Sequence, residues 1–165
     1  MMSYKNILLI NEETLKNYSL LSDNLDFKMV TPIIKLVQEE ILTNLLGEKL
    51  FKEIREQINT DTLTESNREL LDYYITDILI WSIMSKLQIP INYKFRNIGY
   101  AQQSDSNNLS TSLDNIQYLE EWYKSNTQTY IVLMDKFIRG NKSNYPLYCP
   151  NLNYIDNYEC SIYLG

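Results

Sequence analysis

Residues 66–87 read SNRELLDYYITDILIWSIMSKL, and this stretch decides the fold. Its apolar side chains recur at helical spacing, and between Ile78 and Met84 they occupy nearly every side of the predicted helix. A helix that is apolar all round has to be enclosed by other elements. We therefore expect a central helix over 66–87, which Pro90 stops.

Two amphipathic helices are predicted upstream of this central helix. Apolar residues at three- and four-residue steps mark the first over 29–45, with Asp26 as its N-cap and Pro32 in its first turn. Gly47 then separates it from a shorter amphipathic helix that ends at about Asn59.

Two further helices complete the expected bundle. A short N-terminal helix follows Asn11, a suitable N-cap, and a long helix covers about 113–138 and ends at Gly140. The polar residues of 91–112 break the helical pattern and predict a loop or an irregular β-hairpin.

The expected fold class is therefore all-α. It comprises a bundle of four main helices plus the short N-terminal helix, with the loop or hairpin excursion between the third and fourth main helices. This helical domain spans residues 1–140, and an extended Tyr-rich C-terminal arm is expected over 141–165.

Composition excludes several classes of chemistry. The chain of 165 residues carries a net charge of −6 and contains no histidine, so Ser-His-Asp triads, Cys-His pairs and histidine-ligated zinc are absent. Its two cysteines and four glycines are too few for a disulfide framework or a phosphate-binding glycine loop. No stretch predicts a signal peptide or a membrane span. We expect a protein that is not an enzyme, has no cofactor, metal or membrane partner, and is made in the cytoplasm.

Asp72 and Asp77 are the best carboxylate candidates for a metal-dependent enzyme. Asp77 lies between apolar residues, where partial burial would raise its pKa. However, a spacing of five residues places the two side chains on different faces of an α-helix, which disfavours a paired-acid site. A polar seam in which Asp77 pairs with a lysine or a tyrosine hydroxyl is the favoured interpretation.

The excursion holds the nearest approach to a basic-aromatic patch. This short run contains Tyr93, Lys94, Phe95 and Arg96, and the excursion continues through Tyr100, Gln102 and Gln103. Sequence-independent DNA binding depends on clustered lysine and arginine, so an acidic chain with only this small patch argues against DNA binding through a basic surface. Near DNA, such a protein is expected to let the DNA slide rather than to hold it.

The C-terminal arm is predicted to dock on a partner, since tyrosine supplies large contact area at low entropic cost. Its candidate contact residues are Tyr145, Pro146, Tyr148, Tyr154, Tyr158 and Tyr163. Removing residues 144–165 should then abolish docking and leave the bundle folded. The alternative is that the tail folds back on its own bundle.

Two segments resemble the head–tail connector (adaptor) proteins of tailed bacteriophages, crAss-like phages in particular. They are Leu9–Tyr18, which reads LINEETLKNY, and Ile41–Phe51, which reads ILTNLLGEKLF and contains an LLG-x-KL turn. The order of the long third helix, the polar excursion and the fourth helix is also similar, so that the resemblance covers roughly residues 7–139.

The resemblance implies a structural virion protein that forms a ring, typically of twelve copies, under the portal vertex. Such a ring connects capsid to tail, extends the DNA channel and contacts the portal protein and the next collar or tail ring. It further implies that the C-terminal arm contacts the portal, and that the excursion faces a tail component or the lumen. The alternative class is a small helical regulatory or host-interaction protein that binds one partner through its arm.

Overall fold

The computed structural model describes residues 7–20, 26–96, 99–102 and 113–155. The helices of these residues are α1 (Glu12–Tyr18), α2 (Phe27–Val37), the π-helical turn η2 (Gln38–Leu42), α3 (Thr43–Leu46), α4 (Glu48–Asn59), α5 (Glu65–Leu70), the π-helical turn η3 (Leu71–Ile75), α6 (Thr76–Asn92), α7 (Leu113–Gly140) and the short 3-10 helix η4 (Lys142–Asn144). Two short strands, β1 (Tyr93–Arg96) and β2 (Gly99–Gln102), lie between α6 and α7. The predicted all-α class is confirmed.

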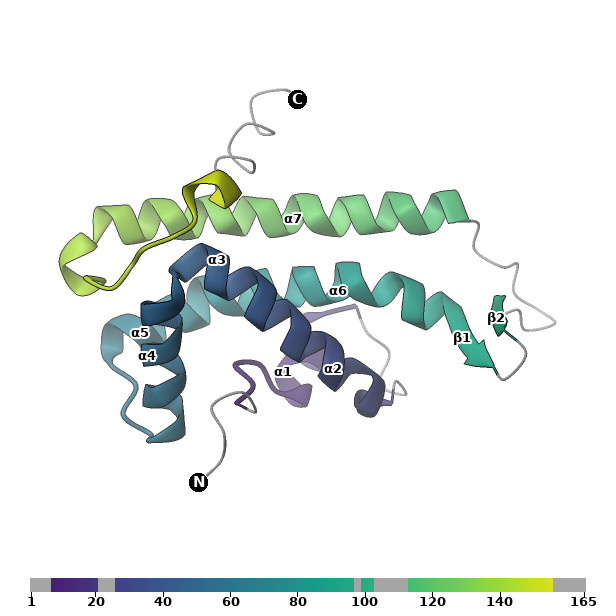
Figure 1. The fold of residues 1–165 in the computed structure, drawn as a ribbon, viewed down its shortest axis with the longest axis horizontal. Helices are drawn as coiled ribbons and strands as arrows, with labels where there is room; N and C mark the ends of the chain where they lie inside the picture. The colour runs from purple at the N-terminus through teal and green to yellow at the C-terminus, as the bar shows by residue number, and fades with distance from the viewer. Residues whose placement is uncertain (1–6, 21–25, 97–98, 103–112, 156–165) are drawn as a thin grey trace.

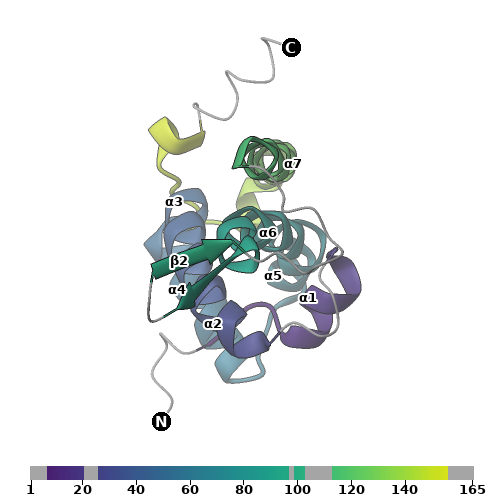
Figure 2. The ribbon, with the colours of Figure 1, turned by 90° about the vertical axis from the view of Figure 1, so that its right-hand side faces the viewer.

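Helix α6 is the central helix of the bundle, as its sequence predicts. It lies alongside α7 over much of its length, while α1 and α2 flank it on other sides (Figures 1 and 2). Ile78, Leu79 and Ile83 are fully buried. Each such side chain contributes about 1.5–3 kcal/mol through the apolar surface that it removes from water.

The two prolines lie deeper in their helices than the sequence predicts. Pro90 does not stop α6, which continues to Asn92. The reason is that Pro90 lies in the last turn, where its missing amide costs a single hydrogen bond. Pro32 is the sixth residue of α2 and so lies in the second turn rather than the first.

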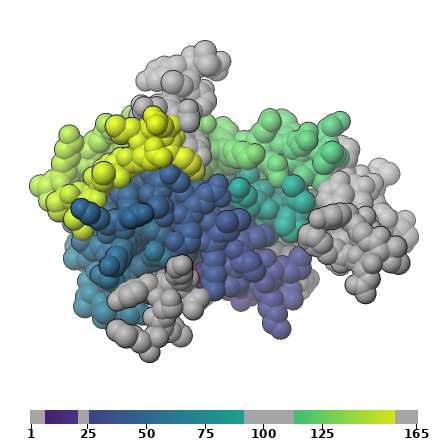
Figure 3. Space-filling model, viewed as in Figure 1, coloured from purple at the N-terminus to yellow at the C-terminus, as the bar shows by residue number. Residues whose placement is uncertain are grey.

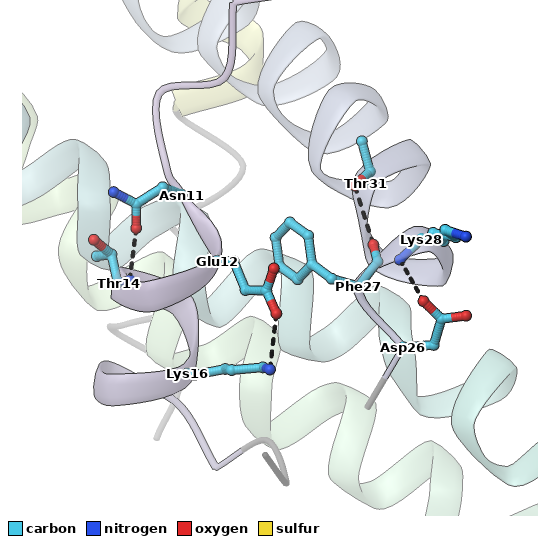
Figure 4. Close-up of polar contacts among 8 residues, drawn as sticks. All are labelled: Asn11, Glu12, Thr14, Lys16, Asp26, Phe27, Lys28 and Thr31. Atoms are coloured by element: carbon cyan, nitrogen blue, oxygen red, sulfur yellow. Dashed lines mark hydrogen bonds and ion pairs between the residues drawn. The ribbon is translucent and has the colours of Figure 1, made fainter. Parts of the chain in front are cut away.

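Helix α1 begins at the predicted cap, and so does α2 (Figure 4). The Asn11 side chain accepts a hydrogen bond from the Thr14 amide at 2.7 Å, and the Asp26 side chain accepts one from the Lys28 amide at 3.0 Å. Each bond satisfies an amide that has no partner within the helix.

The excursion between α6 and α7 contains a β-hairpin, one of the two forms that the sequence predicts. Its strands pair antiparallel, with Tyr93 opposite Gln102 and Arg96 opposite Gly99. β1 directly continues α6, so the hairpin lies at one end of the long α6–α7 pair (Figure 1).

One large apolar residue of α7 faces solvent. The buried stripe of α7 contains Tyr123, Ile131 and Met134, whereas Leu133 is largely exposed. Adjacent helical residues are about 100° apart, so Leu133 lies on a different side of the helix from Met134. Leu133 therefore belongs to the outer surface of α7.

The C-terminal strap, defined here as residues 141–155, returns across the bundle. The Cys149 amide donates to the Leu46 carbonyl at 3.2 Å, and the Asn151 amide donates to the Asn44 carbonyl at 2.8 Å. Figure 3 shows the strap in yellow, covering the molecule beside α3 and α4. These contacts hold the strap against the turn between α3 and α4.

Gly47 makes this close approach feasible. Its φ of +81° lies where L-residues with a side chain are strained, and a β-carbon added there would lie 2.3 Å from the Cys149 carbonyl oxygen. The glycine of the LLG-x-KL turn thus serves both the helix break and the packing of the strap.

Replacing Gly47 with alanine should destabilise the protein by at least about 2 kcal/mol, because backbone strain and a backbone clash add. The matched control is Gly140→Ala, since a β-carbon at Gly140 meets nothing within 4 Å. That variant should be neutral or slightly stabilising, as alanine is the better helix former. Urea denaturation of both variants measures the difference, and equal midpoints would contradict the packing at Gly47.

Candidate interaction surfaces

The tyrosines at the start of the strap are not available as a docking arm. Tyr145 is 3% exposed and its hydroxyl donates to the Ser66 carbonyl at 2.6 Å. Its ring makes an edge contact with Phe137, whose own ring stacks on Tyr74 at 4.8 Å. Tyr145 is therefore part of the core.

Tyr148 completes a buried polar cluster with α7. Its hydroxyl donates to the Asp135 carboxylate at 2.6 Å, and Arg139 donates to the other oxygen of the same carboxylate. Because Asp135 is only 1% exposed, removing either donor would leave a buried carboxylate poorly satisfied. Burial, together with the hydrogen bond to Asp135, raises the pKa of Tyr148 far above its ordinary value.

The prediction of an extended arm is wrong for residues 141–155. Tyr154 packs partly buried against the core, Ile155 is fully buried, and Pro146 is the exposed member of the predicted set. The physical reason is that the bundle leaves an apolar face and unpaired carbonyls at α3, which the strap covers. Tyr158 and Tyr163 lie outside the described residues.

Asp72 and Asp77 line one pocket of about 420 Å³ between α1 and the η3–α6 segment. The prediction that they lie on different faces is wrong because η3 is a π-helical turn, closed by the Thr76 amide donating to the Leu71 carbonyl. In an i→i+5 turn, residues five apart complete about one turn and come to the same side. We call this pocket the acidic pocket; its other lining residues are Leu9, Asn11, Thr14, Tyr18, Leu71, Thr76 and Ile80.

Burial raises the pKa of Asp77 above its ordinary value, as the sequence suggests. No hydrogen bond or ion pair reaches Asp77 from the part of the chain that the structure describes, so the predicted pairing with a lysine or tyrosine is not found there. A partly desolvated carboxylate without a cation beside it is suited to accept a positive side chain from outside.

An aromatic groove of about 240 Å³ adjoins the acidic pocket and shares Tyr18 and Ile80 with it. The groove is lined by Asn17, Tyr18, Ser19, Leu20, Ile80, Trp81, Met84 and Tyr123. Tyr18 and Leu20 are 73% and 72% exposed. Trp122, also partly exposed, extends this aromatic surface by an edge contact with Trp81 at 5.6 Å.

Sequence reasoning missed this groove. Its members come from three segments far apart in the chain, and those on α6 and α7 appear as ordinary core residues in their own helical patterns. The available signal was on α7, where Tyr118 and Trp122 are four residues apart on the side opposite the buried stripe.

The predicted contact residues of the excursion lie on both strands of the hairpin. Strand β1 consists of Tyr93, Lys94, Phe95 and Arg96, and strand β2 contains Tyr100 and Gln102. The two strands thus bring Lys94 opposite Ala101 and Phe95 opposite Tyr100 in register. Gln103 lies outside the described residues.

Within the described residues, no three acidic or cysteine side chains converge as metal ligands would, and Cys149 is a free, exposed thiol. None of the helices there is long and apolar enough to cross a membrane.

The fold and its surfaces define an all-α bundle with a small β-hairpin at one end and a strap that closes the bundle. The chain belongs to a family of unknown function (DUF6712), whose model matches residues 42–158. The matched segment begins just before the Gly47 turn and includes the whole strap. No curated protein and no solved structure shows a significant match to the chain.

Alkaline pH should destabilise the protein through Tyr145, because burial first, and then Glu69 and Tyr74, raise its pKa to about 12 from 10.0. Between these values the unfolded chain loses the Tyr145 proton while the folded chain keeps it, so the free energy of unfolding falls as pH rises. Urea midpoints measured in steps across this window should fall less steeply for Tyr145→Phe. Tyr118→Phe, an exposed control, should keep the wild-type slope; equal slopes in all three proteins would contradict the prediction.

Proposed function

We propose that this protein is a structural subunit of a head–tail connector ring of a tailed bacteriophage, located in the virion at the portal vertex. In that role it would connect capsid to tail and extend the DNA channel, with neighbouring copies, the portal protein and the next collar or tail ring as partners. The observation that carries the proposal is the set of large apolar side chains left exposed on well-packed helices, among them Tyr18, Leu36, Tyr118 and Trp122.

These exposed side chains support assembly as the mode of action. Clustered aromatic and aliphatic side chains on a protein surface are typical of protein–protein interfaces. Here they lie on α1, α2 and α7, which surround the rigid α6 core on different sides (Figure 2). A subunit with contact surfaces on separate sides suits a ring, in which each copy has two neighbours.

The resemblance of the Leu9–Tyr18 and Ile41–Phe51 segments to connector proteins supports the same proposal. The hairpin at one end of the α6–α7 pair suits contact with a tail component or the lumen. A net charge of −6 suits a conduit along which DNA moves, because an acidic wall repels phosphate.

Contact with the portal is assigned to a shorter segment than the sequence predicts. Since residues 141–155 pack on the bundle, the portal-docking role falls to residues 156–165, which include Tyr158 and Tyr163.

The test of the function is the location of the protein in virions. Mass spectrometry of purified particles should find it in a fixed ratio to the portal protein, and electron microscopy of portal complexes should show an added ring with a central hole. Absence from virions, or one copy bound to a non-virion partner, would overturn the proposal and favour a regulatory or host-interaction protein.

Truncation tests the portal-docking segment. A chain that ends at Ile155 should keep the wild-type melting temperature and lose binding to portal rings in co-sedimentation. A chain that ends at Gly140 should unfold, because Tyr145 and Ile155 leave the core and losses of about 2–5 kcal/mol per large side chain approach the whole stability of a domain. Full binding by the chain that ends at Ile155 would contradict the assignment.

A further inference from the structure

The surface of α2 that faces away from the core combines apolar side chains with an exposed cation. Met29 and Leu36 are 43% and 57% exposed and lie seven residues apart, on the same face of the helix, with Pro32 between them. Lys28 begins this face. We call Lys28, Met29, Pro32 and Leu36 the α2 ridge.

The Lys28 ammonium group has no partner in the part of the chain that the structure describes. Asp26, its nearest acidic neighbour in sequence, accepts from the Lys28 backbone amide instead. Figure 4 shows the Lys28 side chain extending on the side of α2 away from α1. The cation is therefore presented to the outside.

The acidic pocket and the aromatic groove have the complementary pattern. Asp77 and Asp72 lie at one end, and Trp81 and Met84 continue the surface along α6. Along α6, Met84 follows Asp77 by seven residues, and along α2, Leu36 follows Lys28 by eight. At a rise of 1.5 Å per helical residue, both surfaces are therefore about 10–12 Å long. A ridge of this length can set its cation at the carboxylates and its apolar residues in the groove.

We infer that the α2 ridge of one copy docks in the acidic pocket and aromatic groove of a second copy, with Lys28 beside Asp77 and Met29, Pro32 and Leu36 against Tyr18 and Trp81. The charge complementarity of the two surfaces selects this occupant. Methionine also packs favourably against aromatic rings.

The two surfaces cannot meet within one chain. Figure 2 shows α1, which borders the pocket, and α2 on different sides of α6. The contact is therefore head-to-tail between copies, and repetition of it builds a ring when the rotation closes. This inference rests on the proposed ring and names the contact that closes it.

Charge reversal of the full chain tests the contact. Sedimentation velocity over a concentration series up to the solubility limit should show self-association of the wild type. Lys28→Glu and Asp77→Lys should each weaken it at least about tenfold, because a like charge then faces an intact partner. Lys142→Glu, a charge reversal at an exposed lysine of η4, is the matched control and should associate like the wild type.

A mixture of the two variants gives the sharper result. The intact groove of Lys28→Glu can accept the intact ridge of Asp77→Lys, and the two reversed charges also complement each other. Equal amounts should therefore regain the association that each variant alone has lost. The double variant should regain chain-like association. Circular dichroism verifies folding, and Asp77→Asn replaces Asp77→Lys if the latter unfolds, with weaker association expected.

Three outcomes would overturn the inference: a wild type that stays monomeric, single variants that associate like the wild type, or a mixture that does not regain association. Failure of the contact is distinguishable from failure of the function. Rings on the portal vertex that survive Lys28→Glu would refute this contact and leave the connector role standing, whereas absence from virions would refute the role itself.

Discussion

The backbone contact between Gly47 and Cys149 is the constraint on which the rest of the surface depends. At this point two backbones pack with no side chain between them, and the strap can then pair its amides with the carbonyls of Leu46 and Asn44. Once the strap lies there, Tyr145 fills the core and Tyr148 satisfies the buried Asp135. The strap therefore closes one side of the bundle and leaves interaction surfaces to other elements.

The π-helical turn η3 has a comparable influence on the side of the molecule that faces α1. One additional residue per turn rotates everything upstream of Thr76 relative to α6. As a result Asp72 comes to the same pocket as Asp77, beside the aromatic groove against which α1 packs. An acidic and aromatic surface is thereby assembled from segments that a regular helix would separate.

These two features together give the protein surfaces of different character. One side is closed by its own strap, one presents carboxylates and aromatic rings, and one presents the ridge of α2 with Lys28. The segment that matches the DUF6712 family model contains both the Gly47 turn and the strap. The assembly proposed here uses the surfaces that the strap leaves free.

The sequence by itself determined the helices, because periodicity and capping are local: Asn11 and Asp26 cap where expected, and the all-apolar run around Ile78 is the core of the bundle. It also located the excursion that contains the hairpin. Only the tertiary structure decided that Tyr145 and Tyr148 belong to the bundle, that Pro90 lies within α6, and that Asp72 joins Asp77. Those outcomes depend on contacts between residues far apart in the chain and on one irregular turn, neither of which leaves a periodic signal in the sequence.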